Sequence, residues 1–324
     1  MAKYITSFQT LADYEAAKEN LNYPNVTLID EDGSLRYEKE EPPHDYSKDF
    51  FTMNIATGGD IVWSGSTTAN TLSYSKDNGQ TWATADSATT ISVNDGDKVL
   101  WKGTPTPRIN KGIGRFSGDT TVRYEAQGNT MSLLYGENFS GQTSLSGKDY
   151  ALYGLFIANT NVTSAENLVL PATTLTDYCY QYMFQGCSSL TTAPSVLPAT
   201  TSAGSCYNSM FNGCTSLTTA PELPATTLAN GCYSNMFYGC SSLTTAPELP
   251  ATTLKYGCYQ NMFRNCSSLN YIKCLATDIS ANNCTSNWVN GVASSGTFVK
   301  DASMTGWTSG VNGIPNGWTV VDAV

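Results

Sequence analysis

Apolar residues return at a fixed interval through the C-terminal half of this chain. Cysteine, phenylalanine and leucine keep the same order in each copy, and two prolines follow them. The interval is 26 or 27 residues, counted between the first cysteines of the copies: Cys179, Cys206, Cys232, Cys258 and Cys284. A degenerate earlier copy begins near Ala151. A fixed period of this size indicates stacked supersecondary units that bury their apolar faces against one another. The pattern therefore predicts a solenoid.

Each copy predicts two elements. The run Cys-Tyr-x-x-Met-Phe-x-Gly-Cys has apolar residues at i, i+4, i+5 and i+8, which is typical of one or two helical turns ended by glycine. Asn265 takes the place of that glycine in the fourth copy, and asparagine also tolerates a left-handed helix end. The following Ser-Ser-Leu-Thr-Thr-Ala-Pro predicts a short strand with Leu190 and its equivalents facing inward. Strand, proline corner and short helix are the plan of a leucine-rich repeat.

The full unit also carries a family resemblance. Cys-Tyr-x-x-Met-Phe-x-Gly-Cys-Ser-Ser-Leu-Thr-Thr-Ala-Pro-Glu-Leu-Pro-Ala-Thr-Thr-Leu resembles the BspA-like leucine-rich repeats found in surface proteins of gut Bacteroidales and in their phages. The resemblance covers the C-terminal half of the chain. It implies an adhesive or protein-binding surface, and it implies that the protein is not an enzyme.

Residues 1–49 differ in composition from the rest of the chain. A short helix is expected after Thr10, and Val26–Ile29 with Leu35–Tyr37 reads as a hairpin. The charged, proline-bearing residues 38–48 predict a linker. This α/β segment resembles N-terminal segments of virion proteins of Bacteroides phages, including crAss-like phages. The resemblance implies a particle anchor, to which we assign Tyr4, Phe8, Leu11, Tyr14, Val26, Leu28 and Tyr37.

Residues 50–138 alternate between apolar and polar positions in short runs separated by turn sequences such as Lys76–Gly79. This spacing predicts a β-sandwich. Strands are expected to include Thr81–Trp82 and Met131–Leu134. Trp63, Trp82 and Trp101 fit either the core or a sugar-binding platform. The solenoid then spans residues 139–287 and a strand-rich cap spans 288–324. The predicted fold is mainly β with short helices.

Composition narrows the possible partners. The chain has 324 residues and a formal net charge of −10, which argues against a nucleic-acid partner. Threonine, serine, asparagine and tyrosine fill the surface of the repeats, and such a face suits stacking and hydrogen bonding. The alternative is a protease-resistant exterior with no binding role. The opening MAKYITSFQT lacks the apolar region of a signal peptide, and no run reaches the length of a membrane span. We therefore expect synthesis and folding in a cytoplasm.

Few side chains in this sequence are candidates for catalysis or for metal binding. Ten cysteines fall between Cys179 and Cys284, and eight of them form four pairs eight residues apart, a spacing that matches no common zinc site. We predict buried free thiols, with disulfides as the alternative. His44 is the only histidine, so nucleophile systems that need histidine have little support. Glu222 and Glu248 occupy the same position in successive coils, so their side chains are expected to lie about 5 Å apart. This is near the distance between the two catalytic carboxyl groups of retaining glycosidases. We nevertheless predict no catalytic residue, no metal and no cofactor.

These observations predict a virion structural protein, a head fibre or capsid decoration protein at the virion surface. Capsid or tail proteins are expected to bind the N-terminus, and a host surface protein or glycan is expected to bind the repeats. We expect no membrane insertion, and a homo-oligomer with a trimer favoured, since fibres are commonly trimeric. The candidate ligand-binding residues are Tyr180, Tyr207, Tyr233 and Tyr259, for which intercoil packing is the alternative. Two other functions stay open: a tail-associated receptor-binding protein, and a bacterial surface adhesin lacking its signal peptide.

Overall fold

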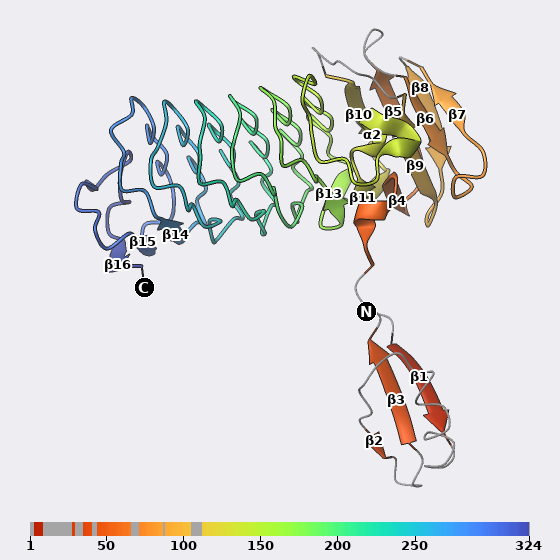
Figure 1. Cartoon of the computed structure of the whole chain (residues 1–324), viewed down its shortest axis with the longest axis horizontal. Coiled ribbons are helices and arrows are strands. Elements are labelled where there is room, and N and C mark those ends of the chain that lie inside the picture. Colours follow the sequence, from red (N-terminus) through yellow and green to blue (C-terminus); the bar gives the residue numbers. More distant parts are fainter. Residues whose placement is uncertain are drawn as a thin grey trace. The chain divides into compact units, whose positions relative to one another are not determined.

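The chain forms two compact units, Met1–Asp45 and Tyr46–Val324 (Figure 1). A computed structural model describes residues 3–8, 28–29, 35–40, 44–65, 71–86, 88–104 and 112–323, the first three ranges by their backbone alone. Strands make up most of the regular structure in these residues, and helices are few and short. The fold is therefore mainly β, as predicted.

The first unit contains a three-stranded antiparallel sheet. Its strands are β1 (Lys3–Phe8), β2 (Leu28–Ile29) and β3 (Leu35–Glu40), in the order β1-β3-β2. The pairing of β2 with β3 confirms the predicted hairpin. Strand β1 adds to this hairpin a strand that the apolar pattern did not predict. The helix expected after Thr10 lies outside the described residues.

The second unit begins with a 3-10 helix, η2 (Tyr46–Lys48), and a domain of two sheets. The strands of this domain are β4 (Phe51–Thr57), β5 (Gly59–Gly65), β6 (Leu72–Ser75), β7 (Ala83–Ala85), β8 (Thr89–Val93), β9 (Lys98–Gly103), β10 (Gly114–Gly118) and β11 (Arg123–Asn129). One sheet has the order β10-β5-β8, and β4, β6, β7, β9 and β11 belong to the other. Phe116 on β10 contacts Trp101 on β9 with ring centroids 4.8 Å apart, so the two sheets bury their aromatic rings against each other.

Two of the expected strands are wrong. Thr81 and Trp82 precede β7 rather than forming a strand, and the segment after Thr130 is helical: α2 (Ser132–Tyr135), then the 3-10 helix η3 (Gly136–Asn138). The Ser132 hydroxyl explains the second difference. It accepts a hydrogen bond from the Phe51 N–H at 2.9 Å and donates one to the Trp101 carbonyl at 3.0 Å. These long-range bonds satisfy polar groups that a further strand would otherwise pair.

The two-sheet domain continues directly into the repeats. Strands β12 (Val162–Ser164) and β13 (Leu168–Val169), which belong to the degenerate first repeat, both pair in parallel with β11. The Phe156 ring contacts Phe116 of the two-sheet domain at 5.7 Å and Phe184 of the next repeat at 5.0 Å. A single hydrophobic core therefore runs from the sheets into the repeats.

The repeats form a stack of similar coils (Figure 1). We name them coil A (179–205), coil B (206–231), coil C (232–257) and coil D (258–283). One phenylalanine from each coil lies in a buried column: Phe184, Phe211, Phe237 and Phe263. Successive rings in this column are nearly parallel, with centroids 5.4 to 5.7 Å apart. Leu190 and its equivalents are fully buried, which confirms that they face inward.

The predicted helical turns of the repeats are wrong. On the side of the coils that carries the cysteines and phenylalanines, every fourth residue has a positive φ. Examples are Tyr178, just before coil A, and Tyr182 and Gly186 within it. Such residues end a right-handed helix at every turn. The backbone N–H groups then alternate: Met183 donates to Tyr180 within the coil, and Phe184 donates to Met210 of the next coil. A four-residue turn is close to the 3.6-residue helical period, so both place the same apolar side chains inward.

The opposite side of the coils is extended and forms single bridges between neighbours, such as Thr192 with Thr219. At the end of the stack, β14 (Tyr271–Cys274), β15 (Thr297–Lys300) and β16 (Thr319–Asp322) form a parallel sheet. Trp288 closes the phenylalanine and tyrosine columns, and its ring stacks on Trp307 at 5.5 Å. Two strands, β15 and β16, lie in the segment 288–324 that was predicted to be a strand-rich cap, whereas residues 288–291 form turns.

Candidate functional site

The predicted tyrosine ladder exists, but it lies inside the stack. Tyr180, Tyr207, Tyr233 and Tyr259 are each only 1 to 2% exposed. The first three rings stack in succession with centroids 5.6 Å apart. Rings this deeply buried cannot contact a ligand on the surface. The assignment of these four residues as ligand-binding is therefore wrong, and intercoil packing describes them.

The ladder carries unpartnered hydroxyl groups. Among the described residues, neither the Tyr180 nor the Tyr207 hydroxyl oxygen has a hydrogen-bond partner. Burial raises the pKa of both phenols well above the ordinary value, and the neighbouring thiols of Cys179 and Cys206 add to this rise. The two phenols therefore stay neutral, and their role is packing rather than acid–base chemistry.

A second tyrosine cluster is reached by solvent, and the sequence reasoning missed it. Tyr150, Tyr153, Tyr178 and Tyr182 are partly exposed and contact one another at the first coils of the stack. Tyr150 and Tyr178 stack with centroids 4.6 Å apart, and both have positive φ. Other coils place serine, glycine or asparagine at these positive-φ positions. That difference between copies was the available signal.

All ten cysteines are buried free thiols, which confirms the prediction. The second cysteine of each coil forms a regular hydrogen bond. The Cys214 thiol donates to the Phe184 carbonyl of the preceding coil at 3.1 Å, and Cys240 donates to Phe211 at the same distance. Burial raises the pKa of Cys179 to about 12 and that of Cys232 to about 11. These thiols are therefore protonated and unsuited to nucleophilic or metal chemistry near neutral pH.

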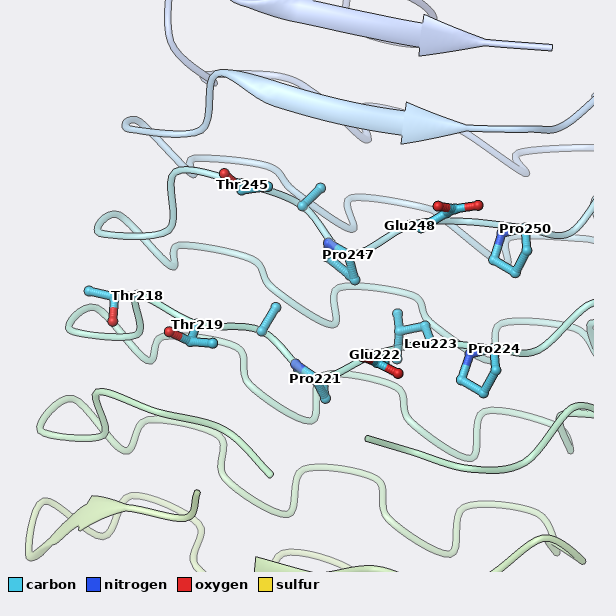
Figure 2. Close-up of a pocket in the computed structure, with 12 residues that line it drawn as sticks. Thr218, Thr219, Pro221, Glu222, Leu223, Pro224, Thr245, Pro247, Glu248 and Pro250 are labelled. Carbon is cyan, nitrogen blue, oxygen red and sulfur yellow. The ribbon is translucent and has the colours of Figure 1, made fainter. Parts of the chain in front are cut away.

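A groove of about 620 Å³ opens between coils B and C on their extended side. Figure 2 shows its two walls, which are the same segment in successive coils. Glu222 lies on one wall and Glu248 on the other, each between two prolines, and both glutamates are exposed. The lining is Thr218, Thr219, Ala220, Pro221, Glu222, Leu223, Pro224, Thr245, Ala246, Pro247, Glu248 and Pro250.

The groove coincides with a break in the backbone hydrogen bonding between coils. Coils A and B are joined on this side by three bridges, and coils C and D by another three. Between residues 218–228 and 244–254, both fully described, there is no bridge and no backbone hydrogen bond. On the opposite side the same two coils are regularly bonded, as from the Phe211 N–H to the Met236 carbonyl at 2.9 Å. Coils B and C therefore separate only on the extended side.

This break corrects the geometry expected for Glu222 and Glu248. The spacing of about 5 Å assumed a closed ladder between neighbouring coils, and that ladder is absent at this pair. Glu248 instead forms an ion pair with Lys273 of coil D, with the carboxylate oxygen 2.9 Å from Nζ. The two glutamates are therefore held by different surroundings, and the catalytic pairing derived from repeat spacing loses its basis.

The remaining candidates are placed as follows. Trp63 and Trp101 are at most 1% exposed and belong to the core, whereas Trp82 is partly exposed and lies beneath Lys102, whose Nζ is 3.9 Å from the ring centroid. Among the described residues no three histidine, cysteine or acidic side chains gather where they could hold a metal ion. No helix in the described part of the chain is long and apolar enough to cross a bilayer.

The proposed anchor residues are placed by backbone alone. Tyr4 and Phe8 lie on β1, Leu28 on β2 and Tyr37 on β3. In the β1–β3 register Phe8 is opposite Leu35 and Thr6 is opposite Tyr37, so Tyr4, Phe8 and Tyr37 occupy positions on one face of the sheet. Leu11, Tyr14 and Val26 lie outside the described residues.

No family model, curated protein or solved structure that was compared with this chain matches it.

Proposed function

We propose that this protein is a structural protein of a phage particle, a head fibre or capsid decoration protein with an adhesive repeat surface. In this proposal the stacked coils are a leucine-rich-repeat solenoid of the BspA-like kind, and the two-sheet domain is a β-sandwich spacer. The first unit attaches the protein to capsid or tail proteins, and the repeats contact a host surface protein or glycan. The protein performs no catalysis.

The observation that carries the proposal is the exterior of the stack. Hydroxyl side chains such as Thr218, Thr219, Thr244 and Thr245 are exposed at the same position of successive coils, while the apolar and thiol side chains face inward. A repeated, nearly uncharged surface can contact a ligand at many equivalent points, which suits adhesion. The division of the chain into two compact units fits a separate attachment segment.

Cryo-electron microscopy of gradient-purified particles tests the proposal. We expect density for a stack of 26-residue coils on the capsid shell, with the first unit against the shell and threefold averaging improving the map. The same density at the tail tip would instead support a receptor-binding role. Absence of the protein from particles, with its presence on bacterial cells, would overturn the proposal in favour of a bacterial adhesin.

A further inference from the structure

The groove lies between the two coil segments that are most alike. Residues 217–228 of coil B and 243–254 of coil C have the same sequence, LTTAPELPATTL. Identical neighbours in a stack normally pair without a change of register, and these coils do pair on their other side. The absence of backbone bridges between coils B and C on their extended side, which we call the open ladder, therefore needs a local cause.

The charge at the facing positions distinguishes this coil pair from its neighbours. A closed ladder would put the Glu222 carboxylate directly beside that of Glu248, and like charges opposite each other destabilise a strand pair. The neighbouring coil pairs avoid this conflict. Coil A presents Val196 opposite Glu222, and coil D presents Lys273, which pairs with Glu248 at 2.9 Å. The ladder is thus open at the one described coil pair in which two glutamates would meet.

The open ladder leaves backbone groups that can form hydrogen bonds. In coil A the Leu197 N–H donates to the Glu222 carbonyl at 3.0 Å, and in coil C the Leu249 N–H donates to the Lys273 carbonyl at 3.0 Å. The equivalent groups across the groove are the Leu223 N–H and the Glu248 carbonyl, which have no backbone partner among the described residues. The Glu248 N–H and the Pro221 carbonyl, which correspond to the bonded Glu222 N–H and Ser195 carbonyl of coils B and A, also have no backbone partner among the described residues, so each wall offers donors and acceptors along the direction of a strand.

We propose that this groove binds an extended segment of a partner polypeptide that places a lysine or arginine between Glu222 and Glu248. An extended peptide supplies both missing sets of backbone hydrogen bonds, and its cation relieves the repulsion that keeps the coils apart. The groove volume of about 620 Å³ lies within the range of about 300–1,000 Å³ typical of ligand sites. The inference rests on the proposed binding role of the repeats, but it does not depend on where the protein sits on a particle.

A designed peptide tests this proposal. The probe is a fluorescein-labelled decapeptide with the sequence of residues 218–227 carrying Glu222→Lys, titrated with the full-length protein at low salt. We expect saturable binding by fluorescence anisotropy, at least tenfold tighter than that of the parent peptide with glutamate. Binding should weaken as salt rises, because the central contact is ionic. Equal binding of the two peptides would overturn the proposal.

A protein variant tests the same contact from the other side. Glu222→Lys in the protein places beside Glu248 the residue type that coil D already pairs with it. This change should close the ladder and reduce affinity for the lysine peptide at least tenfold. Glu166→Lys, the same charge change at an exposed position outside the groove, should leave affinity within twofold of the unmodified protein. Equal losses in both variants would attribute binding to net charge and would contradict the proposal.

Hydrogen exchange gives an independent readout. In the free protein, the Leu223 amide should exchange faster than the Leu197 and Leu249 amides, which are bonded to the next coil. The lysine peptide should slow the Leu223 amide, and the Glu222→Lys variant should slow it without peptide. No protection in either case would exclude strand addition. Peptide binding by a protein that is absent from particles would leave the groove proposal standing and remove only the virion role.

Discussion

Tyr207 stacks on Tyr180 with ring centroids 5.6 Å apart and planes within 2°, while the buried hydroxyl groups of both residues have no hydrogen-bond partner among the residues that the structure describes. The rings contribute to packing between coils, and the two oxygens oppose folding because a buried polar group without a partner loses its hydration.

We therefore predict that Tyr207→Phe raises the free energy of unfolding by about 1 kcal/mol. Tyr124→Phe is the matched control. The Tyr124 hydroxyl accepts a hydrogen bond from Asn159 Nδ2 at 2.7 Å, so its loss should lower the free energy of unfolding by about 1–3 kcal/mol. Urea denaturation of both variants measures the difference. Destabilisation of similar size in both would show that the Tyr207 hydroxyl does have a partner, such as a buried water.

The positive-φ positions of the repeats give a second matched pair of variants. Ala158 and Gly213 occupy equivalent positions with positive φ, at 55° and 76°. Ala158→Gly should raise the free energy of unfolding by up to about 1 kcal/mol, because glycine adopts this conformation without steric cost. Gly213→Ala should lower it by about 1 kcal/mol. A methyl group there would meet the Gly186 Cα at 3.6 Å, which is ordinary contact, so the cost arises from the backbone conformation. Thermal or urea unfolding that moves both variants in one direction would contradict this prediction.

The buried thiols predict a loss of stability in alkali. Burial raises the pKa of Cys232 to about 11 and that of Cys179 to about 12, from an ordinary value of 9.0. Below about pH 8 the folded and unfolded chains hold the same thiol protons, so stability is flat. Above about pH 9 only the unfolded chain releases them, and each buried thiol then lowers the free energy of unfolding by about 1.4 kcal/mol per pH unit up to its folded pKa.

Urea midpoints measured from pH 6 to pH 10.5 test this expectation. The midpoint should be constant up to about pH 8 and then fall steeply. Cys232→Ala should be less stable at pH 7 because it leaves a cavity, but its decline in alkali should be shallower by about one proton. An unchanged slope in Cys232→Ala would show that other groups, such as the buried tyrosines, control the alkaline transition.

The packing of the last coil depends on Trp288. Its ring lies between those of Tyr259 and Trp307, and its Nε1–H donates to the Gly313 carbonyl at 2.8 Å. Trp288→Ala should lower the free energy of unfolding by about 3–5 kcal/mol and expose the last coil. Trp288→Phe keeps an aromatic ring and loses the donor, so a smaller loss of about 1–3 kcal/mol is expected. Urea denaturation with circular dichroism distinguishes the two, and equal effects would assign the role of Trp288 to its hydrogen bond alone.

Much of the repeat architecture could be predicted from residue spacing. The 26- or 27-residue period implied stacking, and the columns of Phe211 and Leu217 are buried as that period requires. The local backbone could not be predicted from the same pattern. Asn261 and Asn265 are spaced four apart at positive φ, and such spacing of glycine and asparagine is the signal that distinguishes serial turns from a helix. The period of apolar residues alone does not separate the two.

The exposed side chains were harder to predict than the buried ones. Tyr178, Tyr180 and Tyr182 are adjacent in an alternating run, and an error of two residues moves a tyrosine from the core to the surface. Tyr180 follows an inward-facing cysteine, whereas Tyr178 and Tyr182 occupy the left-handed positions that face outward. Which of them is accessible depends on the turn geometry.

The sequence by itself determined that this protein stacks near-identical units around columns of phenylalanine, leucine and cysteine, because a short repeat can bury its apolar side chains only against its neighbours. Only the tertiary structure decided which neighbouring coils form backbone bridges on their extended side. Coils B and C carry the same twelve residues on their extended side and yet form no bridge there, at the position where closure would oppose Glu222 and Glu248. Which residues face each other is a property of the pair of coils, and it cannot be read from either repeat alone.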